Sequence, residues 1–162
     1  MTLSRFTTSR VRTLTGKGFT DVTKDFESRV GRLDPTILRS NSSPRLQVAD
    51  VRSRIEATAG SSGFMLFGTS DHGALLTLFD KPRKAIQYLV GNPLIALQMT
   101  RRNLGAGLYA PLRVLIYEED GKTFVEYDKA SSLFGQFKDP DIDAVATTLD
   151  QKLEALVTAA IK

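Results

Sequence analysis

Apolar side chains recur every three to four residues in three segments of the chain, and this spacing predicts amphipathic helices. The first segment covers residues 19–33 and the second, shorter one covers 48–59. The third covers 140–161, where Asp139 is suited to cap the helix and Pro140 to occupy its first position. Each helix would bury one face against a shared core.

Alternating β-rich segments predict strands between these helices. An N-terminal strand is expected at 5–14, and a hairpin at 113–118 and 123–127 around Asp120-Gly121, a pair suited to a tight turn. These segments require a sheet. Together with the helices, they indicate one α+β domain over residues 1–162, with helices on one face of the sheet.

Two further segments are less distinct. The apolar runs at 64–67 and 74–79 flank Asp71-His72-Gly73, and we interpret them as a second hairpin with His72 at its connection. The next segment fits a strand or a helix by spacing alone. Asn92-Pro93 decides between them, because an N-cap followed by proline predicts a strand at 84–90 and a helix at 93–102.

Composition excludes several classes of protein. The chain of 162 residues has no cysteine and one histidine, so disulfides and thiolate chemistry are excluded and a metal site is not expected. No apolar run is long enough to span a bilayer. For this reason we expect no membrane partner. The formal net charge is +4, but the bases are scattered, so we expect no nucleic-acid partner either.

The segments DHG, YLVGNPLIALQM and GLYAPLRVLIYEEDGKTFVEYD resemble the family known as domain of unknown function 302. The resemblance covers residues 64–130, with Asn92, Pro93 and Pro111 at motif positions. It implies a β-α-β(4)-α sheet of the TATA-binding-protein-like class, often dimeric. Residues 34–60, a loop and the second helix, would be a helical insertion.

This sequence departs from the family pattern at two positions. Gly91 and Leu112 stand where many members have cysteines. Whatever those thiols do elsewhere cannot happen in this chain.

His72 is the one side chain whose ordinary pKa suits proton transfer near neutral pH, and Asp71 precedes it. The two residues could form an acid–base pair, or they could simply shape a turn. Arg113 could bind a carboxylate or form a salt bridge, and Asn92 could cap a helix or help to bind an anion. The four tyrosines could line a pocket or lie in the core: Tyr88, Tyr109, Tyr117 and Tyr127.

Two functions therefore stay open. The first is a cytoplasmic, cofactor-independent enzyme that binds a small molecule and transfers protons, as an isomerase, cyclase or lyase does. His72 and Asp71 would be catalytic, and the tyrosines, Asn92 and Arg113 would bind an apolar substrate with or without a carboxylate. The alternative is a noncatalytic small-ligand-binding or dimeric interaction module. In either case we expect a homodimer, because helices on one face leave the other face or an edge of the sheet uncovered.

Overall fold

The computed structural model describes residues 3–34, 36 and 48–162, and its centre is a six-stranded sheet. The strands are β1 (Arg10–Thr15), β2 (Gly31–Arg32), β3 (Met65–Asp71), β4 (Ala85–Gly91), β5 (Leu112–Glu119) and β6 (Lys122–Asp128). They lie in the order β1-β6-β5-β4-β3-β2. Only the short β2–β3 pair is parallel. The predicted α+β class is confirmed.

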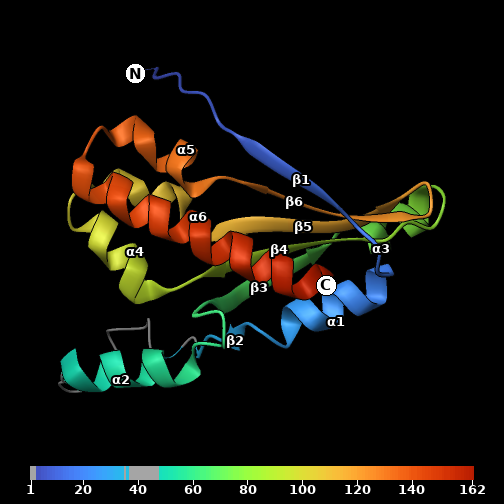
Figure 1. The fold of residues 1–162 in the computed structure, drawn as a ribbon, viewed down its shortest axis with the longest axis horizontal. Coiled ribbons are helices and arrows are strands. Elements are labelled where there is room, and N and C mark those ends of the chain that lie inside the picture. Colours follow the sequence, from blue (N-terminus) through green and yellow to red (C-terminus); the bar gives the residue numbers. More distant parts are fainter. Residues whose placement is uncertain (1–2, 35, 37–47) are drawn as a thin grey trace.

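Two helices cover the inner face of this sheet (Figure 1). They are α1 (Phe19–Glu27) and the long α6 (Pro140–Ile161), and their buried side chains meet those of the strands in one large core cluster. The insertion helix α2 (Val48–Thr58) is different, because its Ile55 packs with Met65 in a separate cluster. Met65 lies on the opposite face from Leu66, its neighbour in β3, which joins the main core.

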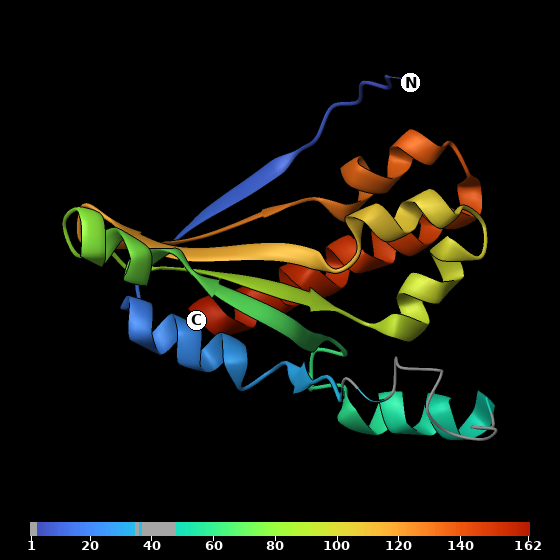
Figure 2. The ribbon, with the colours of Figure 1, turned by 180° about the vertical axis from the view of Figure 1, so that it is seen from behind.

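The remaining helices lie at the two ends of the sheet (Figures 1 and 2). One end carries α3 (His72–Phe79) beside the β5–β6 turn. The other end carries α4 (Pro93–Thr100), the 3₁₀ helix η2 (Leu104–Tyr109), α5 (Ala130–Phe134) and η3 (Gly135–Phe137). No helix within the described ranges is both long and apolar enough to cross a membrane.

Local signals predicted several elements correctly. Asp120 and Gly121 have positive φ values of 52° and 71° in the β5–β6 turn, which is the backbone that a tight hairpin turn needs. The Asp139 carboxylate accepts hydrogen bonds from the first turn of α6, as predicted. Other bounds were too long: α1 ends at Glu27 instead of residue 33, and β1 begins only at Arg10. Most of the predicted loop at 34–45 lies outside the described residues.

The hairpin predicted around His72 is wrong, because residues 72–79 form helix α3. Asp71 caps this helix by accepting a hydrogen bond from the Ala74 backbone N–H at 2.8 Å. Gly73 lets the helix lie directly on the chain before β4, since a Cβ at this position would be 2.3 Å from the Arg83 carbonyl oxygen. The strand that pairs with β3 is therefore β4, and α3 is their connection.

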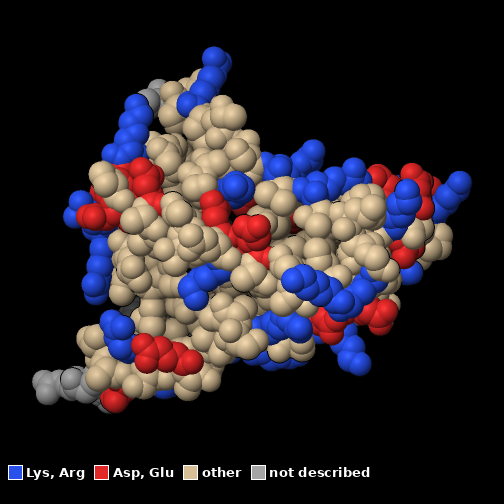
Figure 3. All heavy atoms as spheres, viewed as in Figure 1, with Lys and Arg blue, Asp and Glu red and all other residues tan. Residues whose placement is uncertain are grey.

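Charged side chains are mixed on the face that carries α6 (Figure 3). Lysines and arginines alternate there with aspartates and glutamates. This face offers no continuous basic surface of the kind that a nucleic-acid backbone binds.

Candidate functional site

Helix α4 forms the floor of an apolar cavity, and Asn92 fixes where this helix begins. The Asn92 Oδ1 atom accepts a hydrogen bond from the Leu94 backbone N–H at 2.9 Å, and Pro93 occupies the first helical position. The Asn92 Nδ2 atom donates to the Gly63 carbonyl oxygen at 2.9 Å. One side chain thus ties the start of α4 to the segment before β3.

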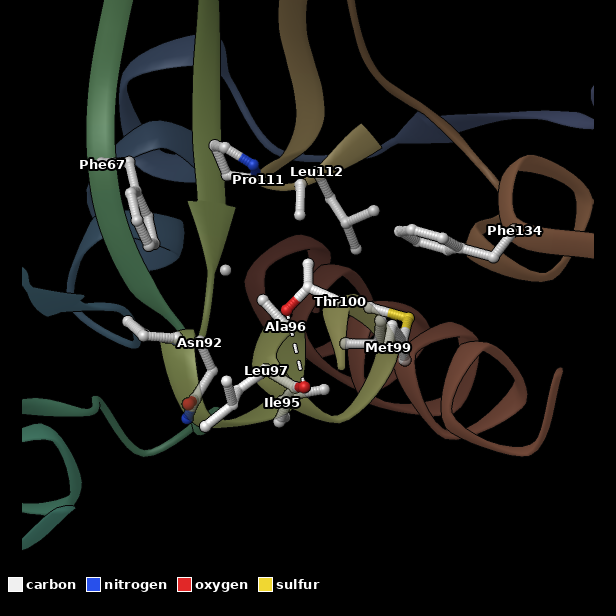
Figure 4. Close-up of a pocket in the computed structure, with 14 residues that line it drawn as sticks. Phe67, Asn92, Ile95, Ala96, Leu97, Met99, Thr100, Pro111, Leu112 and Phe134 are labelled. Carbon is white, nitrogen blue, oxygen red and sulfur yellow. Dashed lines mark hydrogen bonds between the residues drawn. The ribbon is translucent and has the colours of Figure 1, made fainter. Parts of the chain in front are cut away.

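The cavity has a volume of about 250 Å³. Figure 4 shows Ile95, Leu97, Met99 and Thr100 of α4 on one side, with Phe67, Pro111, Leu112 and Phe134 opposite. Phe67 reaches the cavity from a β-bulge, because the β3–β4 register shifts between Leu66 and Gly68. Such a bulge re-aims the side chain that it carries. The lining is almost wholly apolar, so the cavity suits the body of an apolar molecule.

A second cavity of about 410 Å³ adjoins the first and shares the wall formed by residues 110–112. It is lined by Tyr109 and Arg113, together with Leu89 and Leu133. The Arg113 side chain is 61% exposed, and its nearest carboxylate oxygen, on Asp128, is 3.9 Å away. This separation exceeds a hydrogen bond, so Arg113 has donors available for a ligand carboxylate.

Three of the eight predicted site residues therefore line these adjoining cavities: Asn92, Tyr109 and Arg113. The Tyr109 ring packs edge-on against Phe134 and Phe137, and its hydroxyl donates to Gln136 Oε1 at 3.3 Å. Tyr109 is thus held in place by its neighbours and presents one side to the second cavity.

The other three tyrosines lie elsewhere. Tyr88 is fully buried in the core against Phe26, and burial, together with its hydrogen bond to Glu27 (2.7 Å), raises its pKa. Burial also raises the pKa of Tyr127, on the same inner face of the sheet. Tyr117 lies on the outer face, where it donates to Glu126 Oε1 at 2.5 Å; burial is the main cause of its raised pKa, followed by this bond.

His72 and Asp71 lie at the opposite end of the sheet from the two cavities (Figure 1). His72 is the exposed first residue of α3, and it lines neither cavity. The Asp71 carboxylate accepts its hydrogen bond from the start of the helix instead of orienting an imidazole toward a ligand. The structure therefore does not bring the predicted acid–base pair together with the tyrosines or Arg113.

Sequence reasoning missed most residues of the first cavity. They come from β3, α4, β5, α5 and α6, and the local patterns placed Ile95, Leu97 and Leu149 among them on the apolar faces of helices. The missed lining residues are Phe67, Ile95, Ala96, Leu97, Met99, Thr100, Leu112, Phe134 and Leu149. The available signal was the family motif, because its positions all line the first cavity: Gly91, Asn92, Pro93, Pro111 and Leu112.

The fold and cavities define a small α+β protein with an apolar pocket at one end of its sheet. The model of the family described as domain of unknown function DUF302 matches residues 39–160, and the chain belongs to this family. A solved structure titled "uncharacterized conserved protein DUF302" from Bacillus stearothermophilus has the same fold, with a TM-score of 0.67 and 18% sequence identity. The alignment covers 93% of this chain and 97% of the other. No curated protein matches.

Gly91 and Leu112 both line the first cavity. They are the positions at which the sequence resemblance places cysteines in many family members. A Cβ at Gly91 would lie 3.3 Å from the Phe67 ring and 3.4 Å from the Pro111 Cβ, so the glycine leaves space that a larger side chain would fill. Of the two positions where this chain departs from the family pattern, Gly91 thus enlarges the cavity and Leu112 adds an apolar side chain to its wall.

Proposed function

We propose that the protein is a small-ligand-binding module that holds an apolar carboxylic acid. The apolar body would lie in the cavity above α4, and the carboxylate would reach Arg113 through the adjoining cavity. One observation carries the proposal. Arg113, which has no hydrogen-bonded partner among the described residues, lies beside a cavity lined by apolar side chains.

The proton-transfer enzyme expected from His72 stays a prediction. It finds no support in the position of His72, which lines neither of the two adjoining cavities. A binding module requires only the shape of the pocket and the charge at Arg113. The geometry therefore favours the noncatalytic hypothesis. The expected cytoplasmic location also remains a prediction.

The chain contains three methionines, and this permits a direct test. With the methionine methyl groups isotopically labelled, octanoate should shift the resonance of Met99, which is buried in the cavity wall. Ala96→Phe should abolish the shift by filling the cavity. Ala144→Phe, on the exposed surface of α6, is the matched control and should bind as the wild type does.

Octanol separates the contribution of Arg113 from that of the apolar wall. Arg113→Gln should weaken octanoate binding by about tenfold and leave octanol binding unchanged, since only octanoate offers a charge-assisted hydrogen bond. If neither probe shifts Met99, or if Ala96→Phe binds as tightly as Ala144→Phe, the cavity is not the ligand site.

We also propose that two copies pair through the outer face of the sheet, which α1 and α6 leave uncovered. Arginines and acids alternate across this face, so a two-fold arrangement could match opposite charges between copies. The charged residues are Arg10, Arg12, Glu119, Glu126 and Asp128. Light scattering over a tenfold concentration range should show a dimer, and Leu14→Asp, which adds a charge to an exposed apolar position on this face, should give monomers. A monomer mass for the wild type throughout the range would contradict the pairing.

A further inference from the structure

Helix α3 presents an apolar surface that nothing in the described structure covers. The side chains of Leu75, Leu76, Leu78 and Phe79 are 60%, 38%, 76% and 87% exposed. Four of the eight residues of this helix are thus large, apolar and in contact with solvent. A monomeric protein rarely exposes such a continuous group of apolar side chains unless the group binds something.

The way α3 is attached explains why this surface remains exposed. Gly73 is the only buried residue of the helix, and it packs on the backbone near Arg83. The helix is therefore held by its first turn and by the Asp71 cap. The leucines and Phe79 contribute little to the attachment. Their exposure is consistent with a role outside the core.

Basic side chains follow the helix directly. Lys81, Arg83 and Lys84 are all exposed, and the acids near them are Asp80 and, in the adjacent β5–β6 turn, Glu118, Glu119 and Asp120. Of these acids, Glu119 pairs with Arg12. Lys84 pairs with Glu118 at 3.0 Å, and neither Lys81 nor Arg83 has an ion pair within the described residues. An apolar helix with unpaired lysine and arginine beside it has the composition of a segment that rests on an anionic lipid surface.

We infer that α3 docks on an anionic membrane surface, with Leu75, Leu78 and Phe79 inserted among the lipids and Lys81 and Arg83 near the headgroups. The shape supports this partner, because α3 projects at one extremity of the long axis of the molecule and a flat bilayer can reach it (Figures 1 and 2). A second copy fits less well. An eight-residue helix is about 12 Å long, too short to bury the roughly 800 Å² per partner that a stable interface needs.

This inference goes beyond the proposed ligand pocket and does not depend on it. It also revises the expectation of no membrane partner, which considered only segments long enough to span a bilayer. A surface helix needs no such length. The sequence pattern assigns residues 74–79 to one strand of a hairpin, so their exposure on a helix could not be recognised before the fold was known.

The chain has no tryptophan, so a single introduced indole can report contact with lipid. Phe79→Trp should show a blue-shifted emission maximum with vesicles of phosphatidylcholine containing about 30 mol % phosphatidylglycerol, and a smaller shift with phosphatidylcholine alone. Leu104→Trp is the matched control, because Leu104 is equally exposed (86%) at the opposite end of the molecule. Its emission should not change with either vesicle.

Sedimentation of the tryptophan-free protein with the same vesicles tests the two kinds of contact separately. Leu75→Ser/Leu78→Ser should reduce the bound fraction at least tenfold, as should Lys81→Gln/Arg83→Gln, and Leu104→Ser should leave it unchanged. No blue shift for Phe79→Trp, an equal shift for Leu104→Trp, or equal binding to neutral and anionic vesicles would overturn the inference. The exposed helix would then be a site for a protein groove.

Discussion

Replacing Asn92 tests whether this residue acts through the fold or through a ligand. Asn92→Ala removes the N-cap of α4, which typically costs about 1 kcal/mol of the free energy of unfolding. The substitution also removes the hydrogen bond to the Gly63 carbonyl oxygen, which lowers the free energy of unfolding by about 1 kcal/mol more. The expected loss of about 2 kcal/mol corresponds to a fall in melting temperature of roughly 4–8 °C for a domain of this size.

Two variants give this measurement its controls. Asn92→Asp keeps the acceptor for the Leu94 N–H but cannot donate to Gly63, so it should recover about half of the lost free energy, ~1 kcal/mol. Asn103 caps the exposed start of η2 in a similar way, by accepting one hydrogen bond from the Gly105 N–H. Asn103→Ala should therefore lower the free energy of unfolding by less than Asn92→Ala does. Urea and thermal unfolding would measure all three. If Asn92→Ala is no more destabilising than Asn103→Ala, Asn92 is not the structural tie described above.

Three further variants have defined outcomes. Tyr88→Phe should lower the free energy of unfolding by about 1 kcal/mol at neutral pH. The raised pKa of Tyr88 gives stability that is present below pH 10 and lost as the pH rises above it. The variant should therefore lose less stability than the wild type in alkaline unfolding experiments. Burial tends to raise the pKa of Asp139, but hydrogen bonds from the α6 backbone and from Arg102 lower it below its ordinary value. The stability that Asp139 contributes is therefore present above pH 3.8 and is lost as the pH falls below it. In Asp139→Ala, the free energy of unfolding should therefore depend less on pH in that range, and an unchanged acid transition would contradict this. Gly73→Ala should increase amide exchange in α3, since its Cβ would clash with the Arg83 carbonyl; unchanged exchange would disprove the close packing.

Caps and turns could be predicted because their signals are local. Asn92-Pro93 and Asp139-Pro140 each place an acceptor and a proline where a helix begins, and both helices begin there. Asp120-Gly121 likewise determines its own turn. In each case a few adjacent residues fix the backbone, so no knowledge of distant contacts is needed.

Residues 72–79 could not be assigned correctly because a short apolar run has no distinguishing period. The observed helix depends on the Asp71 cap and on the close approach of Gly73 to Arg83, and this second contact joins segments ten residues apart. The short helix α5 was missed for a related reason. A five-residue helix is not stable alone, and α5 exists because Leu133 and Phe134 pack in the core.

The cavity shows why a pocket is harder to predict than the elements that line it. Its walls come from segments between Phe67 and Leu149, and each lining residue has a sequence pattern that also suits a core. The bulge at Phe67 and the missing side chain at Gly91, beside Pro111, help to keep the space open. By contrast, the conspicuous Asp71-His72-Gly73 has a complete structural explanation in two residues, because Asp71 caps α3 and Gly73 docks it. His72 occupies the one position between them that neither requirement restricts, so its being the only histidine is no evidence of catalysis.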